Sequence, residues 1–292
     1  MSVDPALDAP RPATGEGFSD ALTVSLADAR AGVFGTVRLG LAGGSLASGL
    51  VVLFRGSDLA AVAAEGAVET AGAAAWEQVQ AAGIDFETVE SLRAWRLSFA
   101  GQDGSLDLEL EASGEACALD ERDPVARAGG MLGFEQPLHV RGAARLGGER
   151  IAIDGLGQRG RSWGDPDWSK IHRTRTVSAW FGDEAISLAA IAQERDGGHG
   201  GEAVSATLMG LDGCTRVADP RLSTTFDAEG RQQRATLELW VGDEGPPRRA
   251  AGDVLCGTTL DLGRLRLDTA FLEWRCETGT GVGRYDVLRR AS

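Results

Sequence analysis

The sequence predicts an antiparallel all-β protein of many short strands, arranged as a sandwich or a barrel. Apolar residues alternate with other residues along segments such as 22–26, 95–99 and 106–110. A period of two places successive side chains on opposite faces of a strand, one toward a core and one toward solvent. Glycine pairs such as Gly43-Gly44 and Gly147-Gly148 separate these segments, which is typical of tight turns. The alternation and the turns together predict the fold class.

The alternation continues in the second half of the chain, at residues 150–154, 237–241 and 265–267. Two stretches interrupt it. Residues 59–82 are rich in Ala, Glu and Gln, a composition that favours a short helix. Residues 115–133 are rich in Asp, Arg, Ala and Gly and are expected to form a loop across the mouth of a first barrel.

Composition limits the partners and the location of the protein. The chain has 292 residues, a formal charge of −14 and a single lysine, Lys170. Nucleic acid is therefore not expected as a partner, because phosphate contacts need clustered Lys and Arg. No apolar run reaches the roughly 18 residues that a membrane span requires. Residues 1–16 are rich in Pro and acidic, without the features of a secretory signal, so we expect a flexible tail and a cytoplasmic protein.

Neither a metal nor a cofactor is predicted. The four cysteines follow no CxxC pattern, so thiols of a reducing compartment are expected instead of a zinc site. Two of them, Cys256 and Cys276, lie in alternating apolar segments and are expected to be small buried hydrophobes. The three histidines show no HxH or HExxH spacing. Residues 279–283 read Gly-x-Gly-x-Gly but lack the strand-to-helix context of a dinucleotide loop.

Residues 155–168, Gly-Leu-Gly-Gln-Arg-Gly-Arg-Ser-Trp-Gly-Asp-Pro-Asp-Trp, are the most informative stretch. Two Trp, two Arg and two Asp lie at the end of an alternating strand, where β proteins build the mouth of a pocket. The motif resembles the signature of the lipocalin-like hydratase and cyclase superfamily, which includes carotenoid 1,2-hydratases, AttH-type proteins and related Diels-Alderases. Phe18-Ser-Asp, Phe134-Glu-Gln and the closing segment 279–285 extend this resemblance over residues 18–288.

The resemblance implies two lipocalin-like antiparallel β-barrel or sandwich domains packed together. We place the boundary at the glycine-rich turn 142–148, which gives a tail at residues 1–16 and domains at residues 17–145 and 146–292. In the family, the segment matching residues 59–82 is largely strand and connection, which opposes the helix favoured by composition.

One departure from the family pattern bears on chemistry. Members with this motif usually read Arg-Asp-His-Ser-Trp-Gly, whereas this chain has Gly160 and Arg161 at the Asp and His positions. Hydratases of the family are thought to protonate an alkene with an acid, a task for a carboxyl group whose pKa is raised by burial. Arginine cannot act as that acid near neutral pH. We therefore expect Arg161 to face a cavity and anchor a carboxylate or enolate oxygen of a ligand.

The candidate site combines acids with aromatic side chains. The expected catalytic residues are Asp165, Glu194 and Arg161, and the expected ligand-binding residues are Trp163, Trp168, His172, Trp180, Glu135 and Trp274. Trp163 is expected to be largely buried against the second domain, with its indole N–H bonded. Further candidate acids are Asp183, Glu184 and Glu273. In the structural alternative, Asp-Pro-Asp forms a turn and an arginine of the motif pairs with an aspartate of its own loop.

The residues and the resemblance together predict a cofactor-independent enzyme acting on a hydrophobic small molecule. The reaction would be hydration, isomerisation or cyclisation of a terpenoid, polyketide or steroid-like compound in an apolar pocket, because a shaped cavity can hold one reactive conformer. The alternatives are a non-catalytic carrier of a hydrophobic molecule and an interaction module with a vestigial pocket. Fold does not decide among these three functions, and a homodimer is left open.

Overall fold

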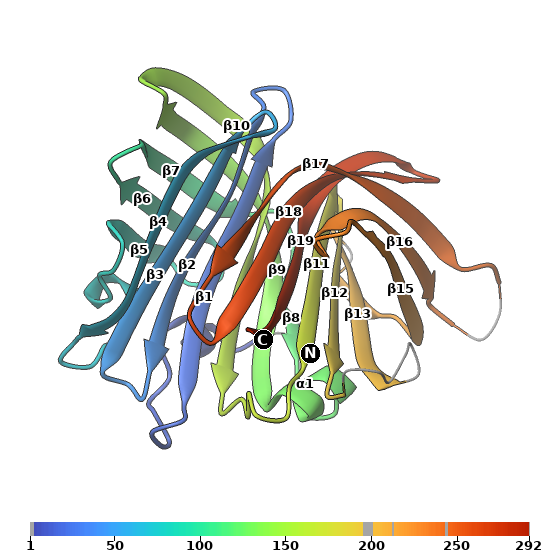
Figure 1. Cartoon of the computed structure of the whole chain (residues 1–292), viewed down its shortest axis with the longest axis horizontal. Coiled ribbons are helices and arrows are strands. Elements are labelled where there is room, and N and C mark those ends of the chain that lie inside the picture. Colours follow the sequence, from blue (N-terminus) through green and yellow to red (C-terminus); the bar gives the residue numbers. More distant parts are fainter. Residues whose placement is uncertain (1–2, 195–200, 212, 243–244, 292) are drawn as a thin grey trace. The chain divides into compact units, whose positions relative to one another are not determined.

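The computed structural model describes residues 3–194, 201–211, 213–242 and 245–291. The chain forms two compact units. Unit 1 comprises Met1–Leu119 and Met131–Pro166, and unit 2 comprises Asp120–Gly130 and Asp167–Ser292. Each unit contains one curled antiparallel sheet (Figure 1). The all-β class and the two lipocalin-like domains are therefore confirmed.

Unit 1 contains a ten-stranded sheet in which the first and last strands pair with each other. Its strands are β1 (Ser19–Asp28), β2 (Val33–Ala42), β3 (Leu46–Arg55), β4 (Asp58–Glu69), β5 (Ile84–Glu90), β6 (Ala94–Ala100), β7 (Gly104–Ala112), β8 (Cys117–Leu119), β9 (Met131–Leu146) and β10 (Glu149–Gly164). The spatial order is β4-β3-β2-β1-β10-β9-β7-β6-β5, and β8 pairs with β9. Two short 3₁₀ helices, η1 (Pro5–Asp8) and η2 (Trp76–Gln78), complete the unit.

Unit 2 contains a nine-stranded sheet, in which the strands that are first and last in sequence again pair with each other. Its strands are β11 (Arg173–Phe181), β12 (Glu184–Ala192), β13 (Glu202–Gly210), β14 (Gly213–Arg216), β15 (Asp219–Phe226), β16 (Gln232–Trp240), β17 (Arg248–Asp261), β18 (Leu265–Cys276) and β19 (Gly279–Arg290). The order is β14-β13-β12-β11-β19-β18-β17-β16-β15. Helix α1 (Pro124–Gly129) begins after Asp123, whose carboxylate accepts from the amide of Val125 at 2.8 Å.

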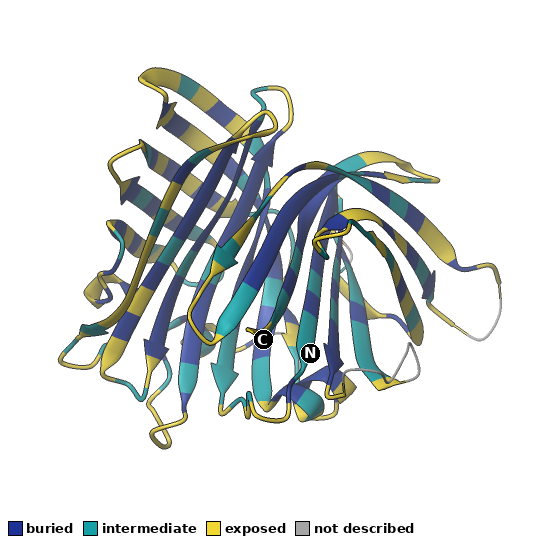
Figure 2. Ribbon diagram, in the orientation of Figure 1, coloured by how far each residue is buried: buried dark blue, intermediate teal, exposed yellow. Residues whose placement is uncertain are grey.

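The predicted alternation accounts for the cores. In β6, Trp95, Leu97 and Phe99 are buried while Arg96 is exposed, and β7 repeats this pattern. Figure 2 shows the resulting stripes of buried and exposed residues along β5, β6 and β7 and along β15 and β16. Each unit has its own apolar core, because one face of each sheet is lined with aliphatic and aromatic side chains.

Two segment predictions are corrected by the structure. Residues 59–82 form β4 and η2, so the helix favoured by composition is wrong there. Strand β4 lies at an edge of the sheet and is mostly exposed, and its pairing with β3 overrides the helix propensity of alanine. Residues 115–133 are not a plain loop, because they contain β8 and α1.

The predicted domain boundary also differs from the observed division. Turn Gly147-Gly148 joins β9 and β10, which pair along their whole length from Glu149↔Leu146 to Gly164↔Met131. A boundary at residues 145 and 146 would split this hairpin, and the division instead follows Pro166. The tail is not free either, since Val3, Asp8 and Pro10 are buried in unit 1.

The cysteines differ in part from expectation. Cys256 is a buried free thiol, as predicted, whereas the free thiol Cys276 is half-buried. Cys117 and Cys214 are disulfide-bonded, so the expectation of thiols is wrong for these two. Among the described residues, no helix is long and apolar enough to cross a membrane.

Candidate functional site

Strand β10 carries the motif singled out in the sequence, and its alternation directs both motif arginines inward. Arg159 and Arg161 are two residues apart, so they lie on the same face of β10, and both are almost completely buried. Opposite them on β9 lie Gln136 and Phe134, which are also buried. The motif therefore places two guanidinium groups inside unit 1.

Arg161 is held by a carboxylate and by two backbone carbonyls. Its Nη1 donates to Asp20 Oδ1 at 3.0 Å and to the carbonyl of Ala21 at 3.3 Å. Its Nη2 donates to Asp20 Oδ2 at 3.2 Å and to the carbonyl of Ala9 at 3.0 Å. The guanidinium also lies 4.5 Å from the ring centroid of Trp76. Both terminal nitrogens are thus fully engaged within unit 1.

Arg159 is held in the same manner by the N-terminal segment. Its Nη2 pairs with Asp8 Oδ1, and its Nη1 donates to Gln136 Oε1 at 3.4 Å. The guanidinium stacks 4.2 Å from the ring centroid of Trp95 and 5.2 Å from that of Phe134. Two acids and two arginines therefore form a compact cluster of no net formal charge, walled by aromatic rings.

Burial perturbs the groups of this cluster. Burial raises the pKa of Asp20, and the neighbouring Arg161 opposes this shift. Burial lowers the pKa of Arg161 to about 10, which leaves the guanidinium charged at neutral pH. Burial also lowers the pKa of Arg159, against the attraction of Asp8. Asp20 is accordingly a desolvated acid, although its oxygens are occupied by Arg161 and by the backbone amide of Arg11 at 2.6 Å.

The expected role of Arg161 is not supported by this geometry, and the structural alternative holds only in part. Arg161 does not pair with an aspartate of its own loop, because its partner Asp20 belongs to β1. Asp165 is exposed. Trp163 is half-buried, less than expected, and packs edge-to-face on Phe134 with ring centroids 6.4 Å apart. It belongs to unit 1, not to the second β unit.

The other predicted site residues do not assemble around the motif. Glu135 is half-buried in unit 1 and accepts from Gln158 Nε2 at 2.9 Å. In unit 2, Trp180 and Trp274 are fully buried core residues, and Trp168 packs on a small cluster of Val125, Ile171 and Ile191. His172 is half-buried, and Glu194 is exposed. The structure therefore divides the predicted residues between two units and several environments.

A cavity of about 420 Å³ opens at one end of the sheet of unit 2. Its apolar wall includes the buried side chains of Ile186, Met209, Leu239 and Ala250 together with the half-buried Phe181. Its polar rim includes Asp183, Glu184, Thr215, Arg248, Cys276 and Glu277. A volume of this size and a wall of this chemistry are typical of a small-molecule site.

Two of the further candidate acids lie on this rim. Glu184 pairs with Arg248 at 3.2 Å across the opening, and both side chains are nearly half-exposed. Asp183 is exposed beside it. Glu273 does not line the cavity and instead pairs with Arg275 at 3.0 Å. Asp183 and Glu184 are therefore the predicted acids that the structure brings to a cavity.

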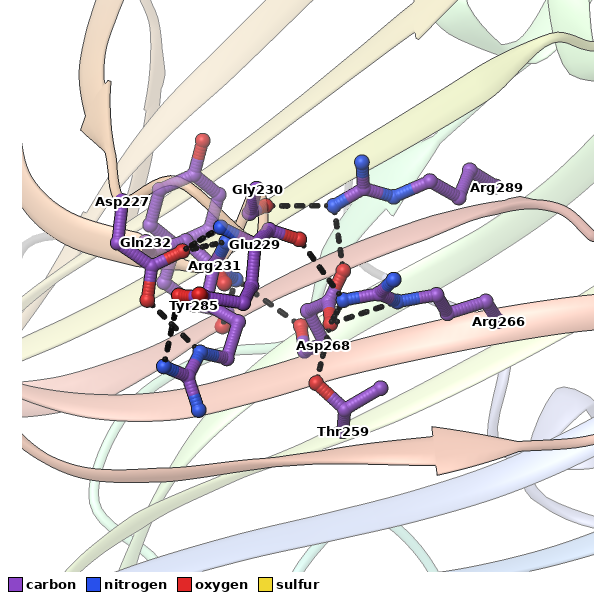
Figure 3. Close-up of polar contacts among 10 residues, drawn as sticks. All are labelled: Asp227, Glu229, Gly230, Arg231, Gln232, Thr259, Arg266, Asp268, Tyr285 and Arg289. Atoms are coloured by element: carbon purple, nitrogen blue, oxygen red, sulfur yellow. Dashed lines mark hydrogen bonds and ion pairs between the residues drawn. The ribbon is translucent and has the colours of Figure 1, made fainter.

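Sequence reasoning missed two buried polar groups in unit 2. Asp268 is buried and accepts hydrogen bonds from Thr259, Arg266 and Arg289, which surround it in Figure 3. Nearby, Gln232 Nε2 donates to the carbonyls of Asp268 and Tyr285. The carboxylate of Asp268 is fully engaged by these donors, so we interpret the Asp268 group as a structural element.

The second missed group surrounds a buried tyrosine. Tyr285 and Thr224 share a 2.6 Å hydrogen bond, and Arg175 donates to Thr224 Oγ1 at 3.3 Å and pairs with Glu202. Burial raises the pKa of Tyr285. An available signal was the placement of Arg175 and Tyr285 on strands with apolar neighbours, where a polar side chain needs a partner.

Within the described ranges of the chain, no group of three or more His, Cys, Asp or Glu residues could hold a metal ion. A family model described as a domain of unknown function, DUF7064, matches residues 4–291. The chain belongs to the DUF7064 family. No curated protein sequence matches this DUF7064 chain significantly.

Solved structures share the fold of this DUF7064 member over nearly its whole length. A proposed AttH (NE1406) from Nitrosomonas europaea has a TM-score of 0.75 at 14% identity, covering 98% of this chain and 96% of that one. Kievitone hydratase from Nectria haematococca has a TM-score of 0.69 at 13% identity, covering 99% of this chain and 93% of that one. CghA with Sch210972 has a TM-score of 0.69 at 12% identity, covering 93% of this chain and 88% of that one. The expected resemblance to lipocalin-like hydratases and cyclases is thus confirmed for the fold.

Proposed function

We propose that the protein binds a small apolar molecule in the cavity of unit 2 and acts on it as an enzyme of the hydratase or cyclase type. The observation that carries this proposal is the cavity of about 420 Å³, with an apolar wall and an ionic rim. The similarity in fold to kievitone hydratase and to CghA with Sch210972 supports the same class of activity. The reaction would be hydration, isomerisation or cyclisation of a terpenoid, polyketide or steroid-like compound, without a cofactor.

The residues proposed for proton handling are those on the rim. Glu184 lies within hydrogen-bonding distance of Arg248, so its carboxylate is positioned at the opening where the polar end of an apolar ligand would lie. A carboxyl group covered by a bound ligand loses water and gains a higher pKa, which suits a general acid. Arg161 is not part of this proposal, because Asp20 and two carbonyls already use its terminal nitrogens.

A carrier without catalytic activity is the second candidate. The observation that favours it is the exposure of Asp165 and Glu194 together with the incomplete burial of Glu184, since a carboxyl group that donates a proton near neutral pH must remain protonated there, which burial favours. The disulfide-bonded Cys117 and Cys214 favour an oxidising compartment over the cytoplasm that the sequence led us to expect. The oligomeric state, including a homodimer, would be read from the mass in solution.

The ligand site is tested with a variant that fills the opening. Thr215 is exposed and lines the rim, so Thr215→Trp should lower the affinity for the apolar probe 8-anilinonaphthalene-1-sulfonate about tenfold or more, a loss of at least about 1.4 kcal/mol. Leu255→Trp is the matched control, because Leu255 is an exposed strand residue outside the cavity. Equal binding by both variants would refute the site.

Enzyme and carrier are separated in two steps. Native mass spectrometry of the purified protein identifies a copurifying apolar ligand, and turnover of that compound is then measured. For an enzyme, Glu184→Gln should retain ligand binding and lose turnover. For a carrier, the compound should return unchanged from both wild type and variant.

A further inference from the structure

The carboxylate of Asp8 occupies a nest of donors that is built from the body of unit 1. Arg159 pairs with Oδ1. Oδ2 accepts from the amide of Leu92 at 2.8 Å and from Trp95 Nε1 at 3.1 Å. Ser91 Oγ lies 3.3 Å from Oδ2 and shares its one proton with the carbonyl of Pro5, which is nearer at 2.9 Å. We call this group of four residues, Arg159, Leu92, Trp95 and Ser91, the donor nest. All four lie more than 80 residues from Asp8 in the sequence.

Three members of the donor nest, Arg159, Trp95 and Leu92, are fixed by contacts that do not involve Asp8. Arg159 is in the middle of β10, which pairs on both sides with β1 and β9. Trp95 belongs to the apolar core of unit 1. Gln136 Nε2 donates to the carbonyl of Leu92 at 2.9 Å. Leu92 has a left-handed backbone with φ of 59°, which is rare for a residue other than glycine, and its amide donates to the Asp8 carboxylate. The donors are therefore preorganised for a carboxylate.

The segment that supplies Asp8 also supplies an apolar body. We call residues 3–11 the strap. Val3 and Leu7 of the strap pack against Phe134, Leu92 and Trp163, next to the donor nest. The strap carries no strand pairing to the sheet, and only η1 gives it regular structure. The Asp8 carboxylate and the aliphatic groups fill the donor nest and its aromatic walls. The backbone of the strap is held separately, because Trp76 Nε1 donates to the carbonyl of Asp8 at 3.0 Å, Arg161 Nη2 donates to the carbonyl of Ala9 at 3.0 Å, and the amide of Arg11 donates to Asp20.

We propose that the donor nest and its aromatic walls are a binding site for a carboxylate that carries an apolar body, and that the strap is its resident occupant. The chemistry of the occupant defines the ligand class. A guanidinium, an indole N–H, a hydroxyl and a backbone amide converge on two oxygens, and the rings of Phe134 and Trp163 take the adjoining aliphatic groups. A monocarboxylic acid with a short chain of apolar atoms has both parts. This proposal is independent of the cavity in unit 2.

A tether makes the strap a strong competitor. A group held by a short linker reaches an effective concentration in the millimolar range, so a free acid must exceed this advantage to displace Asp8. The affinity of wild type for a free carboxylate should therefore be much weaker than that of a full-length variant whose side chain at position 8 cannot enter the nest.

The test uses full-length Asp8→Ala, with octanoate and acetate as probes and octanol and acetamide as their neutral counterparts. Trp95 lies in the nest, so tryptophan fluorescence reports occupancy, and the thermal midpoint reports stabilisation. Octanoate should bind Asp8→Ala at least about tenfold more tightly than wild type. Asp4→Ala is the matched control, because Asp4 is an exposed aspartate of the strap that caps η1.

The outcomes separate a carboxylate site from a merely structural ion pair. Stabilisation of Asp8→Ala by both carboxylates, with no effect of the neutral probes, supports the proposal. Equal responses to octanoate and octanol, or equal binding by Asp8→Ala and Asp4→Ala, overturn it. If Asp8→Ala fails to fold in chloride, recovery of folding in acetate supports the site. If Asp8→Ala also fails to fold in acetate while Asp8→Asn folds, the proposal is overturned.

Discussion

Replacing Arg161 with lysine should destabilise unit 1 without acting through a ligand. Lysine keeps the charge but loses the fork that spans both oxygens of Asp20. One of two charge-assisted bonds is lost, worth about 1.5 to 3 kcal/mol, and the bonds to the carbonyls of Ala9 and Ala21 cannot both be kept, which costs about 1 kcal/mol more. The expected loss is therefore about 3 kcal/mol.

For a unit of this size, 3 kcal/mol corresponds to a fall of roughly 6 to 12 °C in the thermal midpoint. Urea denaturation followed by tryptophan fluorescence measures the loss directly. Arg96→Lys is the control, because Arg96 and Glu87 form an exposed pair at 3.2 Å and the change should cost less than about 0.5 kcal/mol. Unchanged stability of Arg161→Lys together with weaker binding of an oxygenated ligand would refute the reasoning and restore the anchor role.

Three further outcomes are expected. Burial raises the pKa of Cys256 to about 12, so iodoacetamide near pH 8 should alkylate Cys276 and leave Cys256 unmodified in peptide mass maps; labelling of Cys256 in the folded protein would contradict this. In Gly283→Ala the new methyl would overlap a backbone oxygen of β11, so urea denaturation should show a loss of at least about 2 kcal/mol, against less than about 0.5 for the open Gly66→Ala. Burial raises the pKa of Asp20, so the folded state holds the proton of this carboxyl to higher pH than the unfolded chain does. The free energy of unfolding of wild type, relative to that of Asp20→Asn, should therefore fall as pH rises above about 4. A constant difference between the two unfolding free energies from about pH 4 to 7 would exclude the shift.

The fold was largely predictable because strands such as β6, β7 and β16 keep a period of two in their burial. The domain boundary was not, because a hairpin turn such as Gly147-Gly148 and a linker between domains have the same composition. The edge strand β4 was ambiguous for a related reason. Alanine carries a helix propensity, and only the pairing with β3 decides its conformation.

The candidate site was less predictable than the fold. The motif singled out Arg161, but as a ligand anchor or as the partner of an aspartate in its own loop, whereas its partner Asp20 is 141 residues away in sequence. Asp8 lies in a segment whose composition indicates a flexible tail, and its burial follows from Arg159, which is 151 residues distant. Patterns of local spacing cannot identify such pairs. The exposure of Asp165 and Glu194 likewise depends on where strands end in space, which composition does not determine.

During synthesis, helix α1 is made well before the strands against which it packs. Residues 120–130 emerge before β9 and β10 but belong to the unit that is synthesised last. Val125 and Ala126 become buried beside strands β12 and β13, and Asp123 accepts a hydrogen bond from Ser205. Until those strands are made, this small apolar face has no cover. A product that terminates after residue 166 would therefore leave the apolar face of α1 exposed, and exposed apolar surface of this kind makes an incomplete chain prone to aggregation.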